Sequence, residues 1–149
     1  MTRFGRILAP TDFSAASTRA LARAAKLARV NRAQLIVAYV LAPVLPFVGD
    51  GYVPPATYAE LENEAREAAQ RKLDAVVARM TKAGVKARSL LLEGAAADQI
   101  VRAARKHHAD VIVMGTHGRS GLSRFLLGSV AQRVLPLAPC AVLTVRGRG

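Results

Sequence analysis

The chain has 149 residues, of which 52% are hydrophobic and 5% aromatic, and it carries a formal net charge of +12 and a single cysteine. This length is enough for one domain, residues 1–149, that buries a core without disulfides or structural metals. The lone Cys140 excludes an internal disulfide, and its apolar neighbours indicate a buried, unreactive thiol.

Neither an apolar segment nor the basic N-terminus fits a membrane or export signal. Residues 33–49 are uncharged and mostly apolar, but prolines interrupt them and they fall short of the roughly 20 residues that span a bilayer. Near the N-terminus, Arg3 and Arg6 are not followed by the apolar stretch and cleavage site of a signal peptide. We therefore expect a soluble, cytoplasmic protein with no membrane partner.

Short apolar runs and amphipathic segments alternate along the chain, which predicts alternating strands and helices. Strands are predicted at residues 6–10, 35–41, 86–92, 111–114 and 141–145. Helices are predicted from a cap at Ser14 to about residue 30, and at residues 56–83, 95–107 and 128–135. The proline-rich residues 42–55 predict a loop that is long for a connection, and therefore a candidate lid or contact segment.

The longest predicted helix has acidic residues early, Lys82 in its last turn and Gly84 as its stop, in agreement with the helix dipole. Its inward stripe is expected to be Leu61, Ala65, Ala68, Leu73, Val76, Val77 and Met80. On the first helix, Arg19, Arg23 and Lys26 recur opposite the apolar residues, as on a solvated face.

Five strands separated by helices predict an α/β fold: a doubly wound, five-stranded parallel sheet with helices on both faces. If the strand order is 3-2-1-4-5, the winding reverses between strands one and four, and ligands bind outside the carboxyl ends there. That order places Pro10, Thr11 and Asp12 beside Met114 and Gly115. A carboxylate at Asp12 can accept hydrogen bonds from ribose hydroxyls, although a turn-forming or helix-capping aspartate explains the position equally well.

The strand at 111–114 leads into a glycine-rich segment. Gly115 and Gly118 can adopt positive φ and direct several N–H groups toward one point. Gly128 lets a ligand approach the first turn of the next helix, and Ser129 can donate to a phosphate oxygen or cap that helix. This combination indicates phosphate binding, and the alternative is a long strand-to-helix loop in which the glycines only permit turns.

The spacing Gly115-x2-Gly118-x9-Gly128-Ser129, with residues 7–12 and 139–145, resembles the ATP-binding branch of the universal stress proteins over the whole chain. The resemblance implies a Rossmann-like fold of the adenine nucleotide alpha hydrolase type. It also implies ATP as a ligand, with Mg²⁺ or Mn²⁺ held through the phosphates. The implied nucleotide-binding residues, with Asp12 on the ribose and the backbone of Val40 on adenine, are Pro10, Thr11, Asp12, Val40, Met114, Gly115, Gly118, Arg119, Gly128, Ser129 and Val130.

Members of that family usually dimerise through their last strands, and residues 141–145 fit this implication. In the expected order they form an edge strand that has neither charge nor bulge to protect it. We therefore expect a homodimer through this strand. The alternative is that Arg146 and the tail 147–149 protect the edge.

Two functions fit these features: a nucleotide-dependent regulatory module in a stress response, and a slow ATPase or phosphotransferase that uses the same pocket. In the module, ATP would order residues 119–127, and possibly 42–55, and change what a protein partner contacts. For catalysis, Arg119 and Arg124 could supply charge, but there is no Walker-type sequence and the acids near the site reduce to Asp12. Neither the stress signal, the partner nor the choice among ATP, ADP, AMP and a cyclic dinucleotide follows from the residues.

Three histidines remain. His117 could act as an acid or base, but at a loop tip we expect it to be exposed and idle. His107 and His108 lie at a helix end without further ligands, so a favourable interaction with the helix C-terminus is expected rather than a metal site.

The net charge raises nucleic acid as a third possibility. However, the basic residues are spread along the chain, with no run denser than Arg102, Arg105 and Lys106, and interleaved aromatic residues are absent. We expect nonspecific attraction to polyanions at low salt rather than specific binding.

Overall fold

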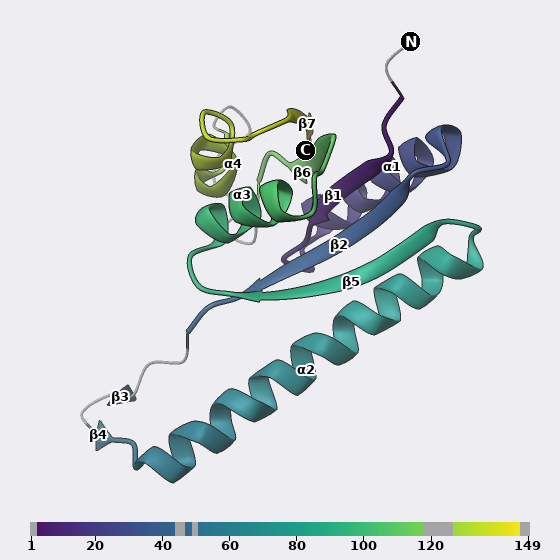
Figure 1. Ribbon diagram of the computed structural model, residues 1–149. Helices are drawn as coiled ribbons and strands as arrows, with labels where there is room; N and C mark the ends of the chain where they lie inside the picture. Colours follow the sequence, from purple (N-terminus) through teal and green to yellow (C-terminus); the bar gives the residue numbers. More distant parts are fainter. Residues whose placement is uncertain (1–2, 44–46, 49–50, 118–126, 147–149) are drawn as a thin grey trace.

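The computed structural model describes residues 3–43, 47–48, 51–117 and 127–146 (Figure 1). Its main strands are β1 (Arg6–Pro10), β2 (Gln34–Leu41), β5 (Lys86–Glu93), β6 (Val111–Gly115) and β7 (Ala141–Val145). Its helices are α1 (Ala15–Asn31), α2 (Pro55–Lys82), α3 (Ala96–Lys106) and α4 (Ser129–Val134). Each of these elements lies within two residues of its expected bounds. None of the described helices is both long and apolar enough to cross a membrane.

The five strands form one parallel sheet in the order β5-β2-β1-β6-β7, which confirms the predicted order and fold class. The strands begin in register, because Arg6 pairs with Gln34 and Gln34 pairs with Lys86. The winding direction reverses between β1 and β6. The carboxyl ends of these two strands therefore form the expected ligand edge of the sheet.

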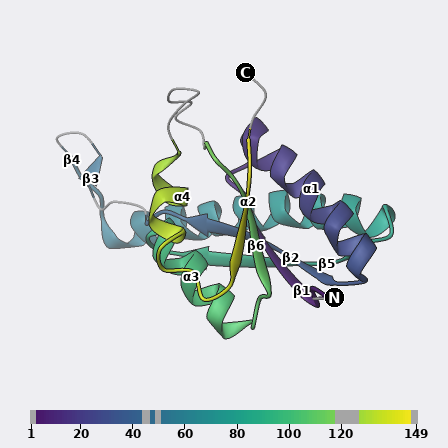
Figure 2. The same ribbon diagram turned by 90° about the horizontal axis from the view of Figure 1, so that it is seen from above.

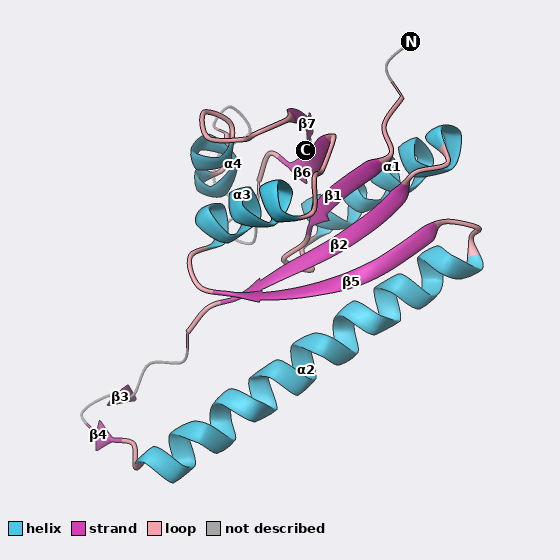
Figure 3. Ribbon diagram, in the orientation of Figure 1, coloured by secondary structure: helices cyan, strands magenta, loops and turns pink. Residues whose placement is uncertain are grey.

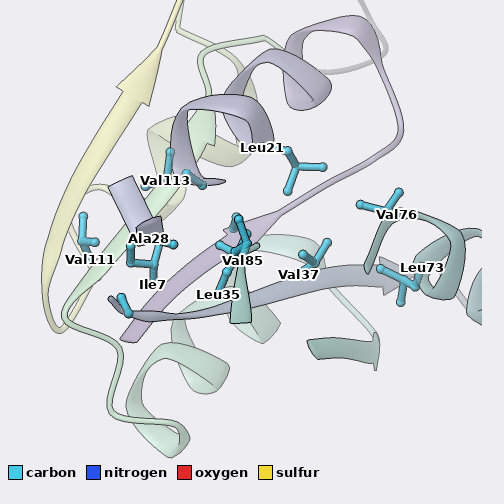
Figure 4. Packing of buried hydrophobic residues seen from close by; sticks show 13 residues of the cluster. Ile7, Leu21, Ala28, Leu35, Val37, Leu73, Val76, Val85, Val111 and Val113 are labelled. Carbon is cyan, nitrogen blue, oxygen red and sulfur yellow. The ribbon is translucent and has the colours of Figure 1, made fainter. Parts of the chain in front are cut away.

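Two helices cover each face of the sheet (Figures 1 and 2). On one face, Leu21 of α1 and Leu73 of α2 pack against inward strand residues such as Leu35, as Figure 4 shows. On the other face, Ile100 of α3 and Val134 of α4 pack against the alternate strand residues. Because both faces are covered, the strands consist of nearly continuous apolar runs.

Helix α2 differs from its expected packing at its first turns. Leu61 was expected to face the core but is 38% exposed, and Ala69, which was not expected, is buried. The reason is geometric, because Arg66 contacts Glu93 at the end of β5 and the turns before it extend past the sheet (Figure 3). Only the later part of the stripe, including Leu73 and Val76, meets strands.

The expected loop 42–55 also contains a feature that the sequence did not suggest. Two short antiparallel strands of two residues each, β3 (Phe47–Val48) and β4 (Gly51–Tyr52), pair with each other within it. Pro55 then opens α2, since proline has no N–H to leave unpaired and its φ already suits the first turn of a helix.

Candidate functional site

A cavity of about 320 Å³ lies at the carboxyl ends of β1 and β6, where the winding reverses. Its apolar wall includes Val40 of β2, Ile100 of α3, Met114 of β6 and Ala131 of α4. Its polar lining comes from the turn after β1, from the first turn of α1 and from both ends of the β6–α4 connection. Those polar side chains are Thr11, Asp12, Ser17, Thr116, His117 and Ser129.

The turn after β1 is held by a cluster of hydroxyl groups. Thr11 is 5% exposed, and its N–H donates to the carbonyl of Ala38 at 2.8 Å. Its Oγ1 accepts from the N–H of Phe13 at 3.0 Å and lies 3.0 Å from Ser17 Oγ. Thr11 and Ser17 are thus buried polar groups with partners, and they fix the backbone on either side of Asp12.

Asp12 forms part of this turn. Its Oδ1 accepts a hydrogen bond from the N–H of Ser14 at 2.9 Å. Ser14 is the N-cap of α1, as expected, and its Oγ accepts from the N–H of Ser17 at 3.2 Å. The turn-forming explanation of Asp12 is therefore correct. It is compatible with ligand binding, because a carboxylate offers about four acceptor sites.

Phe13 links the same turn to the sheet and to α2. Its φ is 63°, an uncommon backbone conformation for a residue with a side chain. Its ring lies 4.9 Å from the ring of Tyr39, which lines the cavity, and Lys72 Nζ lies 5.4 Å from the centre of the Phe13 ring. These contacts stabilise a turn that its backbone conformation alone would not favour.

At the end of β6, Thr116 and His117 form a second polar pair. Thr116 is 6% exposed, and its N–H donates to the carbonyl of Val145 at 3.1 Å. Its Oγ1 lies 2.9 Å from His117 Nδ1. His117 is half-buried and lines the cavity, so the expectation of an exposed loop-tip histidine was wrong. The hydrogen bond from Thr116 to Val145 continues the pairing of β6 with β7 by one residue and keeps His117 beside the sheet, which a loop assignment from sequence does not reveal.

Of the three glycines in the predicted phosphate segment, the structure describes Gly115 and Gly128, and both are required for close packing rather than for positive φ. Gly115 is not among the positive-φ glycines, and a Cβ on it would meet the backbone of Ala16 at 3.3 Å. A Cβ on Gly128 would lie 2.6 Å from the carbonyl oxygen of Thr116, which also accepts the Gly128 N–H. The group that approaches Gly128 closely is thus the protein backbone. Helix α4 has no side-chain cap, so Ser129 does not serve as one.

The structure brings nine of the eleven residues named in advance to this one cavity: Pro10, Thr11, Asp12, Val40, Met114, Gly115, Gly128, Ser129 and Val130. Gly118 and Arg119 lie outside the described residues. Ser17, Tyr39 and Ile100 line the cavity but were not named. Ser17 could have been found, because it follows the Ser14 cap by one helical turn.

Two groups away from the cavity also differ from expectation. His107 accepts a hydrogen bond from Arg88 Nη2 at its Nδ1 (3.0 Å), and burial, followed by neighbouring positive charges, lowers the pKa of His107. Its neutral form is therefore favoured over the charged form that a helix C-terminus attracts. Cys140 is half-buried rather than buried, and burial raises the pKa of its thiol. Among the described residues, no group of three His, Cys, Asp or Glu side chains is placed to hold a metal ion.

Fold and cavity together define a doubly wound α/β protein with a ligand cavity where the sheet reverses its winding. The chain belongs to the universal stress protein family, whose model matches residues 3–146. It is 42% identical over 144 residues to a universal stress protein of Methanocaldococcus jannaschii, covering 96% of this chain and 82% of that one.

Two of the similar solved structures illustrate the shared fold. A second Methanocaldococcus jannaschii protein, whose biochemical function was assigned from its structure, has a TM-score of 0.84 at 25% identity and 99% coverage of both chains. The universal stress protein from Archaeoglobus fulgidus in complex with dAMP has a TM-score of 0.67 at 25% identity. That alignment covers 97% of this chain and 98% of the other.

Proposed function

We propose that this protein binds an adenine nucleotide in the cavity and acts as a nucleotide-dependent regulatory module in a stress response. One observation carries the proposal: the C-terminal end of β1, the C-terminal end of β6 and the first turn of α4 all meet at one cavity. The dAMP complex of the similar Archaeoglobus fulgidus protein supports an adenine nucleotide as the ligand.

The cavity lining fits the parts of such a ligand. The apolar wall, with Val40, Ile100 and Met114, suits the base, and the backbone of Val40 would hydrogen-bond to adenine. Asp12 would accept from the ribose hydroxyls, and Ser129 would donate to a phosphate oxygen. The volume of about 320 Å³ lies at the lower end of the roughly 300–1,000 Å³ of small-molecule sites.

A divalent cation, Mg²⁺ or Mn²⁺, would bind through the phosphates of the nucleotide. The described residues supply no cluster of metal ligands, and Asp12 is the one carboxylate among those that line the cavity. Any such ion would therefore depend on the nucleotide. Metal affinity measured without nucleotide should be weak.

Binding is proposed as the main activity, with slow hydrolysis as the second candidate. Phosphoryl transfer relies on metal-holding carboxylates and a group that orients the nucleophile. His117 lines the cavity, and its imidazole could orient a water molecule for attack. This position supports slow hydrolysis as the second candidate function. A single-turnover assay with Mg²⁺-ATP separates the two: binding without phosphate release supports the module, and release that His117→Gln abolishes supports the enzyme.

The first experiment is mass spectrometry of nucleotide released from the purified protein, followed by calorimetric titration with ATP and magnesium. ATP, ADP, AMP or dAMP in the released fraction would support the proposal and identify the ligand. If no nucleotide is released and saturating ATP produces no heat, the proposed function is wrong.

A matched pair of variants tests the site itself. Asp12→Asn keeps an oxygen for the Ser14 N–H but removes the charge, and we expect nucleotide affinity to fall at least about tenfold, as for a lost charged hydrogen bond. Asp98→Asn makes the same chemical change at an exposed residue of α3 that does not line the cavity. Equal losses in the two variants would contradict the assignment of Asp12.

We further propose a homodimer through β7, which stands at the edge of the sheet. Its Leu143 is 44% exposed, and an apolar edge strand offers unpaired N–H and C=O groups to a second copy. Leu143→Lys should shift the molar mass measured by light scattering from dimer toward monomer. Leu61→Lys, at an exposed leucine of α2, is the control and should not.

The same proposal places the protein in the cytoplasm, where adenine nucleotides are abundant and a free cysteine stays reduced. Fractionation of cells that produce the protein tests this location.

A further inference from the structure

Positive charge gathers at the amino ends of the strands, at the opposite end of the sheet from the cavity. Arg6 opens β1, and the register aligns it with Gln34 of β2 and then with Lys86 of β5. Because neighbouring strands lie about 4.8 Å apart, the backbones at Arg6 and Lys86 are about 10 Å apart along one line. Figure 1 shows these strands starting on the same side, beside the ends of α1 and α2.

The ends of two helices add cations on both sides of this line. Arg29 and Arg32, at the end of α1, share an open hollow of about 360 Å³ with Lys86. On the other face, Arg88 reaches His107 at the end of α3, and the charges of Arg6, Arg88 and Lys106 all act on that imidazole. We call the set Arg6, Arg29, Arg32, Lys86, Arg88 and Lys106 the basic edge.

Little in the described residues offsets these six charges. None of the salt bridges found there involves the basic edge. The carboxylate beside it, Asp110, accepts the N–H groups of Gly5 and Arg6 at 2.7 and 2.8 Å. The C-termini of α1 and α3 carry about −0.5 charge each, so helix dipoles and Asp110 together balance about two of the six.

The negative charge of the chain is concentrated elsewhere. Glu60, Glu62, Glu64 and Glu67 all lie in the first half of α2. That half ends near the carboxyl end of β5, where Arg66 pairs with Glu93, and its earlier turns extend past the sheet (Figure 3). Among the described residues, the basic edge and these four glutamates thus lie toward opposite ends of the strands.

The chemistry of the basic edge selects the kind of partner. Phe4, the aromatic residue next to it, packs against the core and is not available for stacking on a base. Val30, which is 84% exposed, is a single apolar side chain beside these cations and offers little to insert into a lipid surface. A partner with closely spaced negative charges and no need for apolar contact fits this surface, and the phosphate backbone of a duplex is such a partner.

We propose that the basic edge binds the phosphate backbone of double-stranded nucleic acid without reading its bases. The six residues come from separated places in the chain, so no basic run marks them in the sequence. The cavity and the basic edge lie at opposite ends of the same strands, so both ligands can be bound together.

Fluorescence anisotropy with a labelled DNA duplex of mixed sequence, measured over a range of KCl concentrations, tests the proposal. The edge variant Arg6→Gln/Arg29→Gln/Lys86→Gln should lower the slope of log affinity against log salt by about 2.7, because each phosphate contact contributes about 0.9. At 0.1 M salt its affinity should fall at least about tenfold. A second duplex of unrelated sequence should bind the wild type equally well.

The control variant Arg19→Gln/Arg23→Gln/Arg133→Gln removes the same number of exposed charges from other surfaces and should keep the wild-type slope. Equal losses in the two variants would show that net charge, not the basic edge, drives binding, and would overturn the proposal. The proposal would also be overturned if the wild type does not bind the duplex but binds phosphatidylserine vesicles. Circular dichroism checks folding, and if the triple edge variant is unfolded, Arg29→Gln and Lys86→Gln are tested singly, each expected to lower the slope by about 0.9.

Discussion

Replacing Gly128 by alanine tests how the connection between β6 and α4 is built. A Cβ on Gly128 would lie 2.6 Å from the Thr116 carbonyl oxygen and 3.3 Å from the Cα of His117, well inside ordinary contact. Both neighbours are backbone, so the β6 end or the start of α4 must shift. Overpacking of this kind costs about 1–3 kcal/mol, of which the lower unfolded-state entropy of alanine returns about 0.4–1 kcal/mol.

The expected net loss is about 1–2 kcal/mol, which for a domain of this size lowers the melting temperature by about 2–8 °C. Thermal unfolding followed by circular dichroism measures it. Since Thr116, Gly128 and Ser129 line the cavity, calorimetry should also show weaker ATP binding.

Gly5→Ala is the matched control. A Cβ there would meet Asp110 Oδ2 at 3.4 Å, an ordinary contact, and Gly5 is not among the positive-φ glycines. Its melting temperature should stay level or rise slightly. If Gly128→Ala melts with the wild type, or if Gly5→Ala loses as much as Gly128→Ala, the close-packing account of Gly128 is refuted.

Three further outcomes are expected. In urea denaturation, Leu73→Ala should cost about 3 kcal/mol because the side chain is fully buried, whereas Leu61→Ala on the same helix, at 38% exposure, should cost less than about 1 kcal/mol; similar costs would contradict the described packing of α2. Ser14→Ala should destabilise by about 1 kcal/mol through loss of the cap on the Ser17 N–H, and Ser14→Asp should restore most of it, which a role unrelated to capping would not produce. The pKa of His107 is lowered in the folded state, so its contribution to stability is present above the ordinary value near 6.5 and is lost as the pH falls. On acidification the wild type should therefore lose more stability than His107→Gln, and parallel plots of unfolding free energy against pH for the two proteins would contradict this.

Much of the fold could be predicted because strand and helix periodicities are explicit in this chain. The strands at 6–10 and 141–145 match β1 and β7 residue for residue, since apolar runs bounded by charge or proline leave little freedom. The strand order 3-2-1-4-5 was assumed as a common doubly wound arrangement rather than derived from particular residues, and the observed sheet has that order. Leu61 was misassigned because helical periodicity indicates a face but not how far the sheet beneath it extends.

The site was predicted less completely. Asp12 was placed in the cavity from topology, but its hydrogen bond to Ser14 could be seen only with the turn in three dimensions. The contact between Gly128 and the Thr116 carbonyl joins residues that the sequence separates, so the need for glycine there was attributed to a ligand. His117 was expected at an exposed loop tip for the same reason, because burial depends on distant partners.

Helix α2 passes from a packed to a solvent-surrounded setting within one continuous run. Around Leu73 it packs against the sheet, whereas before Arg66 its turns rely on pairs such as Arg66 with Glu62, worth a few tenths of a kcal/mol. Amide protons in those early turns therefore exchange with solvent by fraying, while those near Leu73 exchange only when the whole domain opens. A single helix thus belongs to two cooperative units, and its first half can reshape without unfolding the rest.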